Sequence, residues 1–181
     1  MPHVCPWWGG YFIDNWFRRW LHSPERILEP YVEPGMTVLD FGCGMGICSV
    51  AMARMVGDDG RVIAVDVQRQ MLDVLSKRAT KAGVGQRIHT HQCSADSLDI
   101  DEPVDFALAF YSAHEVPDAE RLLREIYGLL QPKWRFAVVE PVGHVPKNQF
   151  SRMVTLAEEL GFHVAERPQI RLSHTVMLVK Q

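Results

Sequence analysis

The chain has 181 residues, of which 47% are hydrophobic and 23% are charged. That length is enough to bury the core of one globular domain without disulfide support, and it leaves no room for a second domain of useful size. The formal net charge of −3 is small and the basic residues are scattered, so the composition argues against a nucleic-acid-binding surface.

Cysteine spacing and hydropathy restrict the setting of the protein. The four cysteines form no C-x-x-C pair, which is unlike a structural zinc site or a small disulfide scaffold. No apolar run approaches the ~20 residues of a membrane span, and no basic stretch followed by an apolar segment opens the chain. We therefore expect a soluble, cytoplasmic protein without a membrane partner.

From residue 37 onward, strand-like apolar runs alternate with helix-period segments, which is typical of a parallel sheet covered by helices on both faces. Ahead of it, residues 6–21 are rich in aromatics, and Ser23 and Pro24 open a helix as a cap and a first-turn proline. In chain order, the expected elements are a strand at 37–41, a helix from the glycine loop to about 57, a strand at 62–66, a helix at 68–81, strands at 87–92 and 104–110, a helix at 119–130, a strand at 136–139, a helix at 149–160, and strands at 162–166 and 175–180. Only residues 168–174 separate the last two strands, so these two can pair only as an antiparallel hairpin.

A strand that runs into three closely spaced glycines, Gly42, Gly44 and Gly46, is the central motif. Glycines there let the backbone approach a ligand where a β-carbon would collide. Dinucleotide folds space these glycines as G-x-G-x-x-G, whereas the third glycine here arrives one residue early. Asp40, just before the loop, would repel a pyrophosphate but attract a ligand that carries an ammonium and a sulfonium. The sign of this charge favours S-adenosylmethionine over NAD.

Asp66 ends the second predicted strand, twenty residues after Gly46. A carboxylate at this place can accept both hydroxyls of an adenosine ribose. Both classes of cofactor use such an acid, so Asp66 supports adenosine binding without choosing between them.

These motifs resemble a known family. Residues 38–46 are similar to motif I of class I S-adenosylmethionine-dependent methyltransferases, and residues 63–66 are similar to motif II. Further likeness to the small-molecule methyltransferases of the ubiquinone/menaquinone-biosynthesis type lies in residues 93–98, 104–116, 129–133 and 138–141. The resemblance implies a Rossmann-like α/β fold with a seven-stranded, mostly parallel sheet of order 3-2-1-4-5-7-6, whose last strand is antiparallel. It also implies one methyltransferase domain over residues 1–181, with 1–35 as an aromatic lid segment and 36–181 as the cofactor-binding core.

S-adenosylmethionine is the cofactor that this resemblance implies. Its methionine end would lie on Asp40, Gly42 and Gly44, its ribose on Asp66, and its adenine between residues 94 and 97. The cofactor-binding residues expected in all are Asp40, Gly42, Cys43, Gly44, Asp66, Val67, Ser94, Ala95, Asp96, Phe110 and Tyr11. The chain departs from the family at residues 133–135, where glycines are usual, and at Cys93 and Ser94, where Gly-Asp is usual, so Asp96 or backbone would meet the adenine amino group.

Catalytic candidates lie after the fourth predicted strand. His114, near the carboxyl ends of the parallel strands, could deprotonate a phenol or enol, or could instead cap the following helix or pack the pocket floor. Tyr111 could lie along the cofactor or fill the top of the sheet. Glu140 belongs to the same edge, although Glu-Pro there could serve only to turn the chain.

The aromatic amino-terminal segment leaves two interpretations open. Trp7, Trp8, Tyr11 and Phe12 could wall the acceptor pocket as a lid, or could pack on the sheet or on a second subunit as a homo-oligomer contact. His3 and Cys5 could in principle bind a soft metal or metalloid, but two ligands are too few to predict a metal site.

The expected activity is methyl transfer to a small-molecule acceptor at oxygen, carbon, nitrogen or sulfur. An Asn/Asp-Pro-Pro-aromatic motif, common in enzymes that methylate base amines or side-chain amides, does not follow the fourth strand. The alternatives are a cofactor-binding module without catalysis and a nicotinamide-dependent oxidoreductase, which Asp40 and the glycine spacing disfavour.

Overall fold

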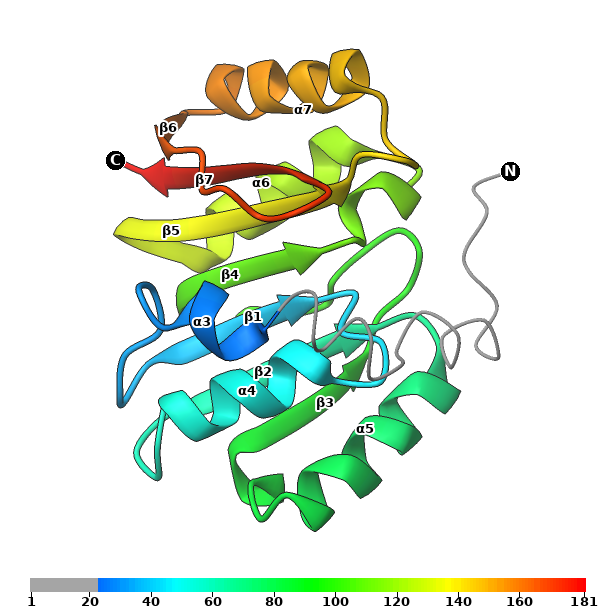
Figure 1. Cartoon of the computed structure of the whole chain (residues 1–181), viewed down its shortest axis with the longest axis vertical. Coiled ribbons are helices and arrows are strands. Elements are labelled where there is room, and N and C mark those ends of the chain that lie inside the picture. The colour runs from blue at the N-terminus through cyan, green and yellow to red at the C-terminus, as the bar shows by residue number, and fades with distance from the viewer. Residues whose placement is uncertain (1–22) are drawn as a thin grey trace.

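In the computed structural model, which describes residues 23–181, a seven-stranded sheet runs through the molecule in the order β3-β2-β1-β4-β5-β7-β6 (Figure 1). The strands are β1 (Thr37–Phe41), β2 (Arg61–Asp66), β3 (Ile88–Gln92), β4 (Val104–Phe110), β5 (Leu130–Pro141), β6 (Phe162–Glu166) and β7 (Ser173–Lys180). This order and the α/β class confirm the fold that the sequence predicts.

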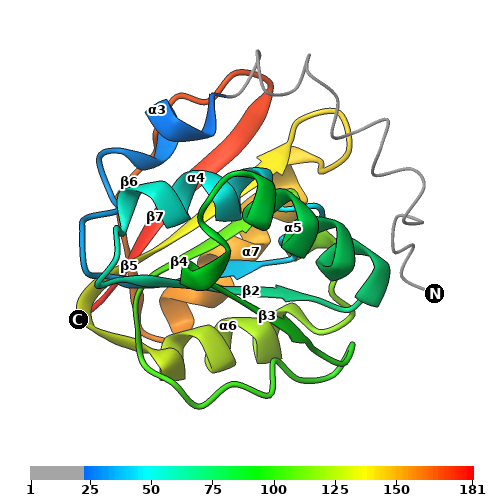
Figure 2. The same ribbon diagram turned by 90° about the horizontal axis from the view of Figure 1, so that it is seen from below.

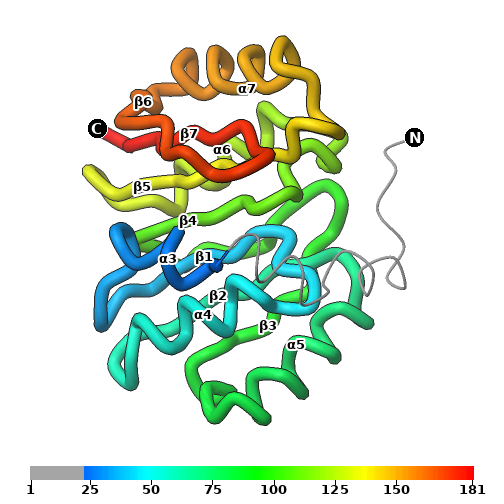
Figure 3. The backbone as a smooth tube through the Cα atoms, viewed as in Figure 1, coloured from blue at the N-terminus to red at the C-terminus, as the bar shows by residue number. Residues whose placement is uncertain are grey.

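Strand direction follows from the connections. The pairs among β1 to β5 are parallel, because a helical or long connection separates each strand from the next. β7 runs antiparallel to both β5 and β6. The antiparallel pairing of β6 with β7 confirms the predicted hairpin of the last two strands. The backbone trace in Figure 3 shows β7 lying between β5 and β6.

Helices cover both faces of the sheet (Figure 2). They are α3 (Pro24–Leu28), α4 (Ile47–Met55), α5 (Arg69–Lys81), α6 (Ala119–Leu129) and α7 (Lys147–Glu159), with short 3-10 turns η1 (Gly85–Arg87) and η2 (Ala113–Glu115). Side chains of α3, α4 and α5 share one apolar core, and those of α6 and α7 share the other. Successive residues of a strand point to opposite faces, so Val38 belongs to the first core and Leu39 to the second.

Two local expectations differ from the structure. β5 begins at Leu130, six residues before the predicted start, because Leu130 is buried and pairs with Val104 before the register shifts to Phe106 and Arg135. Trp134 in this irregular stretch is partly buried against both cores. Ser23 does precede α3 with Pro24 in the first turn, but its side chain makes no capping hydrogen bond.

Parallel strands place their carboxyl ends at one edge of the sheet. The loops that leave β1, β2, β4 and β5 therefore meet at this edge, where ligands of open α/β sheets bind. No helix in the part of the chain from residue 23 onward is both long and apolar enough to cross a membrane.

Candidate functional site

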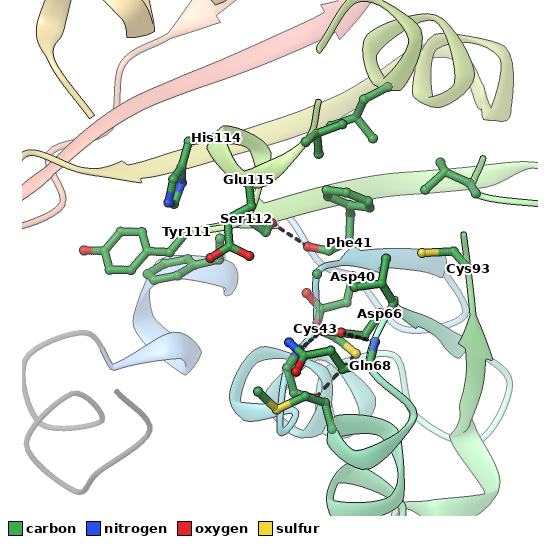
Figure 4. Close-up of a pocket in the computed structure, with 18 of the residues that line it drawn as sticks. Asp40, Phe41, Cys43, Asp66, Gln68, Cys93, Tyr111, Ser112, His114 and Glu115 are labelled. Atoms are coloured by element: carbon green, nitrogen blue, oxygen red, sulfur yellow. Dashed lines mark hydrogen bonds between the residues drawn. The ribbon is translucent and has the colours of Figure 1, made fainter. Parts of the chain in front are cut away.

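A cavity of about 880 Å³ opens at the carboxyl edge of the sheet. Its walls come from the ends of β1 and β2 on one side and from the segments after β4 and β5 on the other (Figure 4). It lies where β1 and β4 are neighbours and the strand order reverses direction, the switch point of this sheet. The volume is in the upper part of the range of small-molecule sites.

The three glycines of the loop have different structural roles, although all three have a positive φ. A β-carbon on Gly42 would lie 2.3 Å from Cβ of Ser112, and one on Gly46 would lie 2.0 Å from Cδ1 of Leu75. A β-carbon on Gly44 would meet no atom of another described residue within 4 Å, and Gly44 lines the cavity. Gly42 and Gly46 are thus required by packing, and only Gly44 leaves its space to a ligand.

Asp40 is a buried carboxyl group at the floor of the cavity, with 2% of its surface exposed. The hydroxyl of Ser49 donates a hydrogen bond to its Oδ2. Burial raises the pKa of Asp40 to about 7, helped by the nearby charge of Asp66 and opposed by the Ser49 hydrogen bond. Near neutral pH the group is therefore only partly ionised, and among residues 23–181 no positive group stabilises its charge.

Asp66 faces the cavity from the end of β2 (Figure 4). Its Oδ2 accepts the backbone N–H of Gly44 at 2.9 Å, and its Oδ1 accepts that of Gln68 at 2.8 Å. Burial raises its pKa in spite of these hydrogen bonds. Each oxygen still has capacity for another donor, because a carboxylate has about four acceptor sites.

Among the residues expected around an adenine, Ser94 and Ala95 line the cavity together with Val67 and Phe110. Asp96 does not line it: its side chain is 86% exposed and lies 3.9 Å from Arg121 in an ion pair. Leu98, which the expected set omits, lines the cavity, and its N–H donates to Glu125 Oε2 at 2.7 Å.

His114 and Glu140 form a pair on the opposite wall. The backbone N–H of His114 donates to Glu140 Oε1 at 3.0 Å, and the ring Nδ1 lies 2.6 Å from Oε2. Burial lowers the pKa of His114, but the hydrogen bond and charge of Glu140, with a smaller contribution from Glu115, raise it above its ordinary value. The sequence predicts that Glu140 lies at this edge but gives no partner for it, because only the pairing of β4 with β5 brings Glu140 and His114 together.

Tyr111 lines the cavity with a φ of 62°, an uncommon value for a residue with a side chain. Its hydroxyl is 2.7 Å from Oγ of Ser173 at the start of β7, and its ring packs against Phe110 with centroids 4.7 Å apart. These contacts hold the ring across the top of the sheet, between β4 and β7.

Three cysteines, Cys43, Cys48 and Cys93, also line the cavity. Burial raises the pKa of the Cys93 thiol to about 11 and that of Cys43 well above its ordinary value. No group of three or more potential metal ligands occurs among residues 23–181. Tyr11, the tryptophans at 7 and 8, Phe12, His3 and Cys5 lie outside the described residues.

Negative charge dominates the lining. The carboxylates are Asp40, Asp66, Glu115, Asp118 and Glu125, whereas Arg121 is the one lysine or arginine among the described lining residues. Arg121 is itself paired with Glu125 at 3.2 Å. The cavity therefore favours a cationic ligand over a phosphorylated one.

Comparison with known proteins agrees with this geometry. A family model described as a methyltransferase domain matches residues 38–133, from β1 through the start of β5. This chain belongs to that methyltransferase family. The match includes the glycine loop, Asp66 and His114, so the methyltransferase domain contains most of the cavity described above.

Two curated relatives illustrate the range of likeness. The methyltransferase chain is 31% identical over 152 residues to a demethylmenaquinone methyltransferase of Lactobacillus johnsonii, covering 80% of this chain and 62% of that protein. It is 29% identical over 132 residues to the ubiquinone/menaquinone biosynthesis C-methyltransferase UbiE of Vibrio vulnificus, covering 72% of this chain and 49% of that one. The chain thus spans about half to three fifths of the length of these relatives.

Solved structures show the same fold. A SAM-dependent methyltransferase from Aquifex aeolicus superposes with a TM-score of 0.87 at 22% identity, over 98% of this chain and all of that one. The [4+2]-cyclase SpnF superposes with a TM-score of 0.72 at 21% identity, over 86% of this chain and 62% of that one. Since the second protein is a cyclase, the shared fold alone does not define the reaction.

Proposed function

We propose that this protein transfers a methyl group from S-adenosylmethionine to a small-molecule acceptor. The observation that carries the proposal is the buried Asp40 carboxyl, which lines a cavity rich in carboxylates and lacks a positive partner among the described residues. A cationic ligand at this place would restore ionisation of Asp40, whereas a pyrophosphate would repel it.

The described residues fit an adenosyl ligand with a charged methionine end. Gly44 leaves open space beside the backbone, and Asp66 keeps free acceptor capacity in the cavity. Apolar lining from Val67, Leu98 and Phe110 suits a flat aromatic ring.

We assign the methionine end to Asp40, Gly42, Cys43 and Gly44, and the ribose to Asp66. Val67, Ser94, Ala95 and Phe110, with Leu98, would surround the adenine. The exposed Asp96 would stay at the rim, where it is paired with Arg121. When bound, S-adenosylmethionine would supply an electrophilic methyl group on its sulfonium and would itself become a neutral thioether once the acceptor has taken that group.

The protein's own contribution is to bind, orient and shield. In-line transfer needs an acceptor held close to the methyl carbon with water excluded. The wall of Tyr111, His114 and Glu115 faces the cavity opposite Asp40 and Asp66, and so is the surface that would hold the acceptor (Figure 4).

Free thiols at Cys43 and Cys93 suit a reducing compartment, so we propose that the enzyme acts in the cytoplasm. The acceptor is proposed to be a small molecule because the cavity is formed by strand ends and loops of the described residues, and Arg121 is the one lysine or arginine in that described lining.

Thermal unfolding with ligands tests the cofactor. S-adenosylhomocysteine at about a hundred times its dissociation constant should raise Tm by roughly 5–10 °C, and NAD should leave it unchanged. Asp66→Asn should abolish most of the shift, while the exposed Asp101→Asn keeps it. A shift with NAD alone would contradict the proposal, and binding without turnover of any acceptor would reduce the protein to a cofactor-binding module.

A further inference from the structure

The pair formed by His114 and Glu140 is more constrained than a surface ion pair. Glu140 is 1% exposed, and both its carboxylate oxygens bind groups of one residue, the backbone N–H and the ring Nδ1 of His114. A buried carboxylate is costly unless it is paired and hydrogen-bonded, so this arrangement strongly favours a single orientation of the ring.

The pairing also fixes which ring nitrogen carries the proton. An ionised carboxylate only accepts, so Nδ1 must donate to Glu140, and the neutral ring then has its lone pair on Nε2. No residue between 23 and 181 hydrogen-bonds to Nε2. His114 lines the cavity with about 15% of its side chain exposed, so Nε2 is the ring position left for a ligand.

We propose that Nε2 of His114 takes the proton from a hydroxyl group of the methyl acceptor. Glu140 is the positioning residue that orients the imidazole ring and stabilises its protonated form during this transfer. The proposal rests on the function proposed above and adds the chemical class of the acceptor: an O–H acid such as a phenol or enol.

The choice of acceptor class follows from acidity. A thiol has a pKa near 8.5 and is partly ionised at neutral pH, whereas a phenol near 10 is almost wholly protonated. A positioned base therefore accelerates methylation of a weakly acidic hydroxyl and does little for a group that is already an anion.

The proton is accounted for at each stage. The O–H bond of the acceptor breaks and an Nε2–H bond forms, which leaves an imidazolium beside the Glu140 carboxylate. That ion pair is neutral overall, and the imidazolium returns its proton to solvent before the next turnover.

The surroundings of the ring support a positive charge on it. Glu115 lies one residue away in η2, and the ring of His144, in the loop after β5, packs edge-on at 5.6 Å. The other titratable side chains nearby are Tyr111 at the end of β4 and His174, whose backbone is in register with Glu140 across β5 and β7. The net effect raises the pKa of His114, with Glu140 as its main positive contributor.

Titration tests the pair without turnover. The imidazole of His114 is followed by NMR from pH 5 to 9 and assigned with His114→Gln. Glu140→Gln should lower the pKa of His114, because it removes the charge that stabilises the imidazolium, and Glu120→Gln on the exposed side of α6 should not. Should Glu140→Gln fail to fold, Glu140→Asp keeps the negative charge but holds it farther from the ring, and it should lower the pKa of His114 less. A pKa of His114 that is unchanged in Glu140→Gln overturns the proposed role of Glu140.

Turnover tests the acceptor class. With cofactor saturating, so that titration of Asp40 does not enter kcat, His114→Gln should reduce kcat for 4-methoxyphenol by about 10²–10⁴-fold. For 4-nitrophenol, which is largely ionised at about pH 8, the same variant should lose less than about tenfold. The acid limb of the kcat profile should move to lower pH in Glu140→Gln, a shift that a merely structural role would not produce.

Equal losses for the two phenols overturn the base assignment. A wild-type protein that methylates 4-methoxythiophenol but neither phenol overturns the acceptor class and leaves methyl transfer standing. A protein that methylates none of the three also overturns the acceptor class. The thermal-unfolding test with S-adenosylhomocysteine then decides the proposed function, and the NMR titration decides the pairing of His114 with Glu140.

Discussion

At the scale of single residues, Asp40 links cofactor binding to pH. Its pKa of about 7 belongs to the protein without a cation, and a bound ammonium would favour the carboxylate. The affinity for S-adenosylhomocysteine should therefore be constant above about pH 8 and fall by up to tenfold per pH unit below about pH 7. Calorimetry across this range measures the dependence, together with the proton released on binding.

Ser49 provides the matched variant for that titration. Its hydroxyl stabilises the ionised Asp40, so Ser49→Ala should raise the pKa of Asp40 and move the midpoint of the affinity curve to higher pH. Asp40→Asn should bind weakly and without this pH dependence. An affinity that is flat from pH 5.5 to 8.5 in the wild type would contradict the role given to Asp40.

Gly42 and Gly44 should respond differently to the same substitution. Both have positive φ, so alanine adds about 1 kcal/mol of backbone strain at either position. Only at Gly42 does the new methyl group overlap Ser112, which should cost roughly a further 1–3 kcal/mol. Urea unfolding should show the larger loss for Gly42→Ala, while Gly44→Ala should chiefly weaken ligand binding. Equal losses of stability would refute the division of tasks between the two glycines.

Residues whose position depends on their own strand alone could be placed from the sequence. Asp40 and Asp66 are assigned by their places at the ends of two apolar runs, and the structure brings both to the cavity. Glu140 could not be assigned, because its partner lies 26 residues away in sequence and meets it only through strand pairing. For the same reason the sequence could not distinguish a glycine that faces a ligand from one that faces Ser112 or Leu75.

At the scale of helices and strands, periodicity located every strand of the described sheet within a few residues, except the start of β5. The strands are short apolar runs bounded by glycine or polar turns, which is a local signal. The early start of β5 depends on pairing of Leu130 with Val104, a contact that no local pattern encodes.

The start of α6 offers a test of helix capping. The Asp118 carboxylate accepts the backbone N–H of Arg121, so Asp118→Ala should destabilise the protein by about 1 kcal/mol. Ser23 precedes α3 without such a bond, and Ser23→Ala should change the free energy of unfolding by only a few tenths. Chemical denaturation of both variants measures the difference, and a larger effect at Ser23 would show that the cap assignments are reversed.

At the scale of the whole molecule, Lys180 connects the end of the last strand, β7, to the end of α6 and the start of β5. Its Nζ donates to the carbonyls of Tyr127 and Leu130 at 2.7 and 2.6 Å and lies 4.6 Å from the centroid of the Tyr127 ring. Lys180→Met should leave those carbonyls without this donor and lower stability by about 1–3 kcal/mol. The exposed Lys77→Met serves as the control and should stay within about 0.5 kcal/mol of the wild type in equilibrium unfolding.

The reactivity of two cysteines that line the cavity can report whether a ligand occupies it. Alkylating reagents attack thiolates, and the raised pKa values of Cys43 and Cys93 keep both thiols protonated at neutral pH. Their modification by iodoacetamide should be slow, should accelerate as the pH rises, and should be suppressed further by any molecule that fills the cavity. Mass spectrometry of the two cysteine-containing peptides would then allow ligands to be ranked without a label, a chromophore or knowledge of the acceptor.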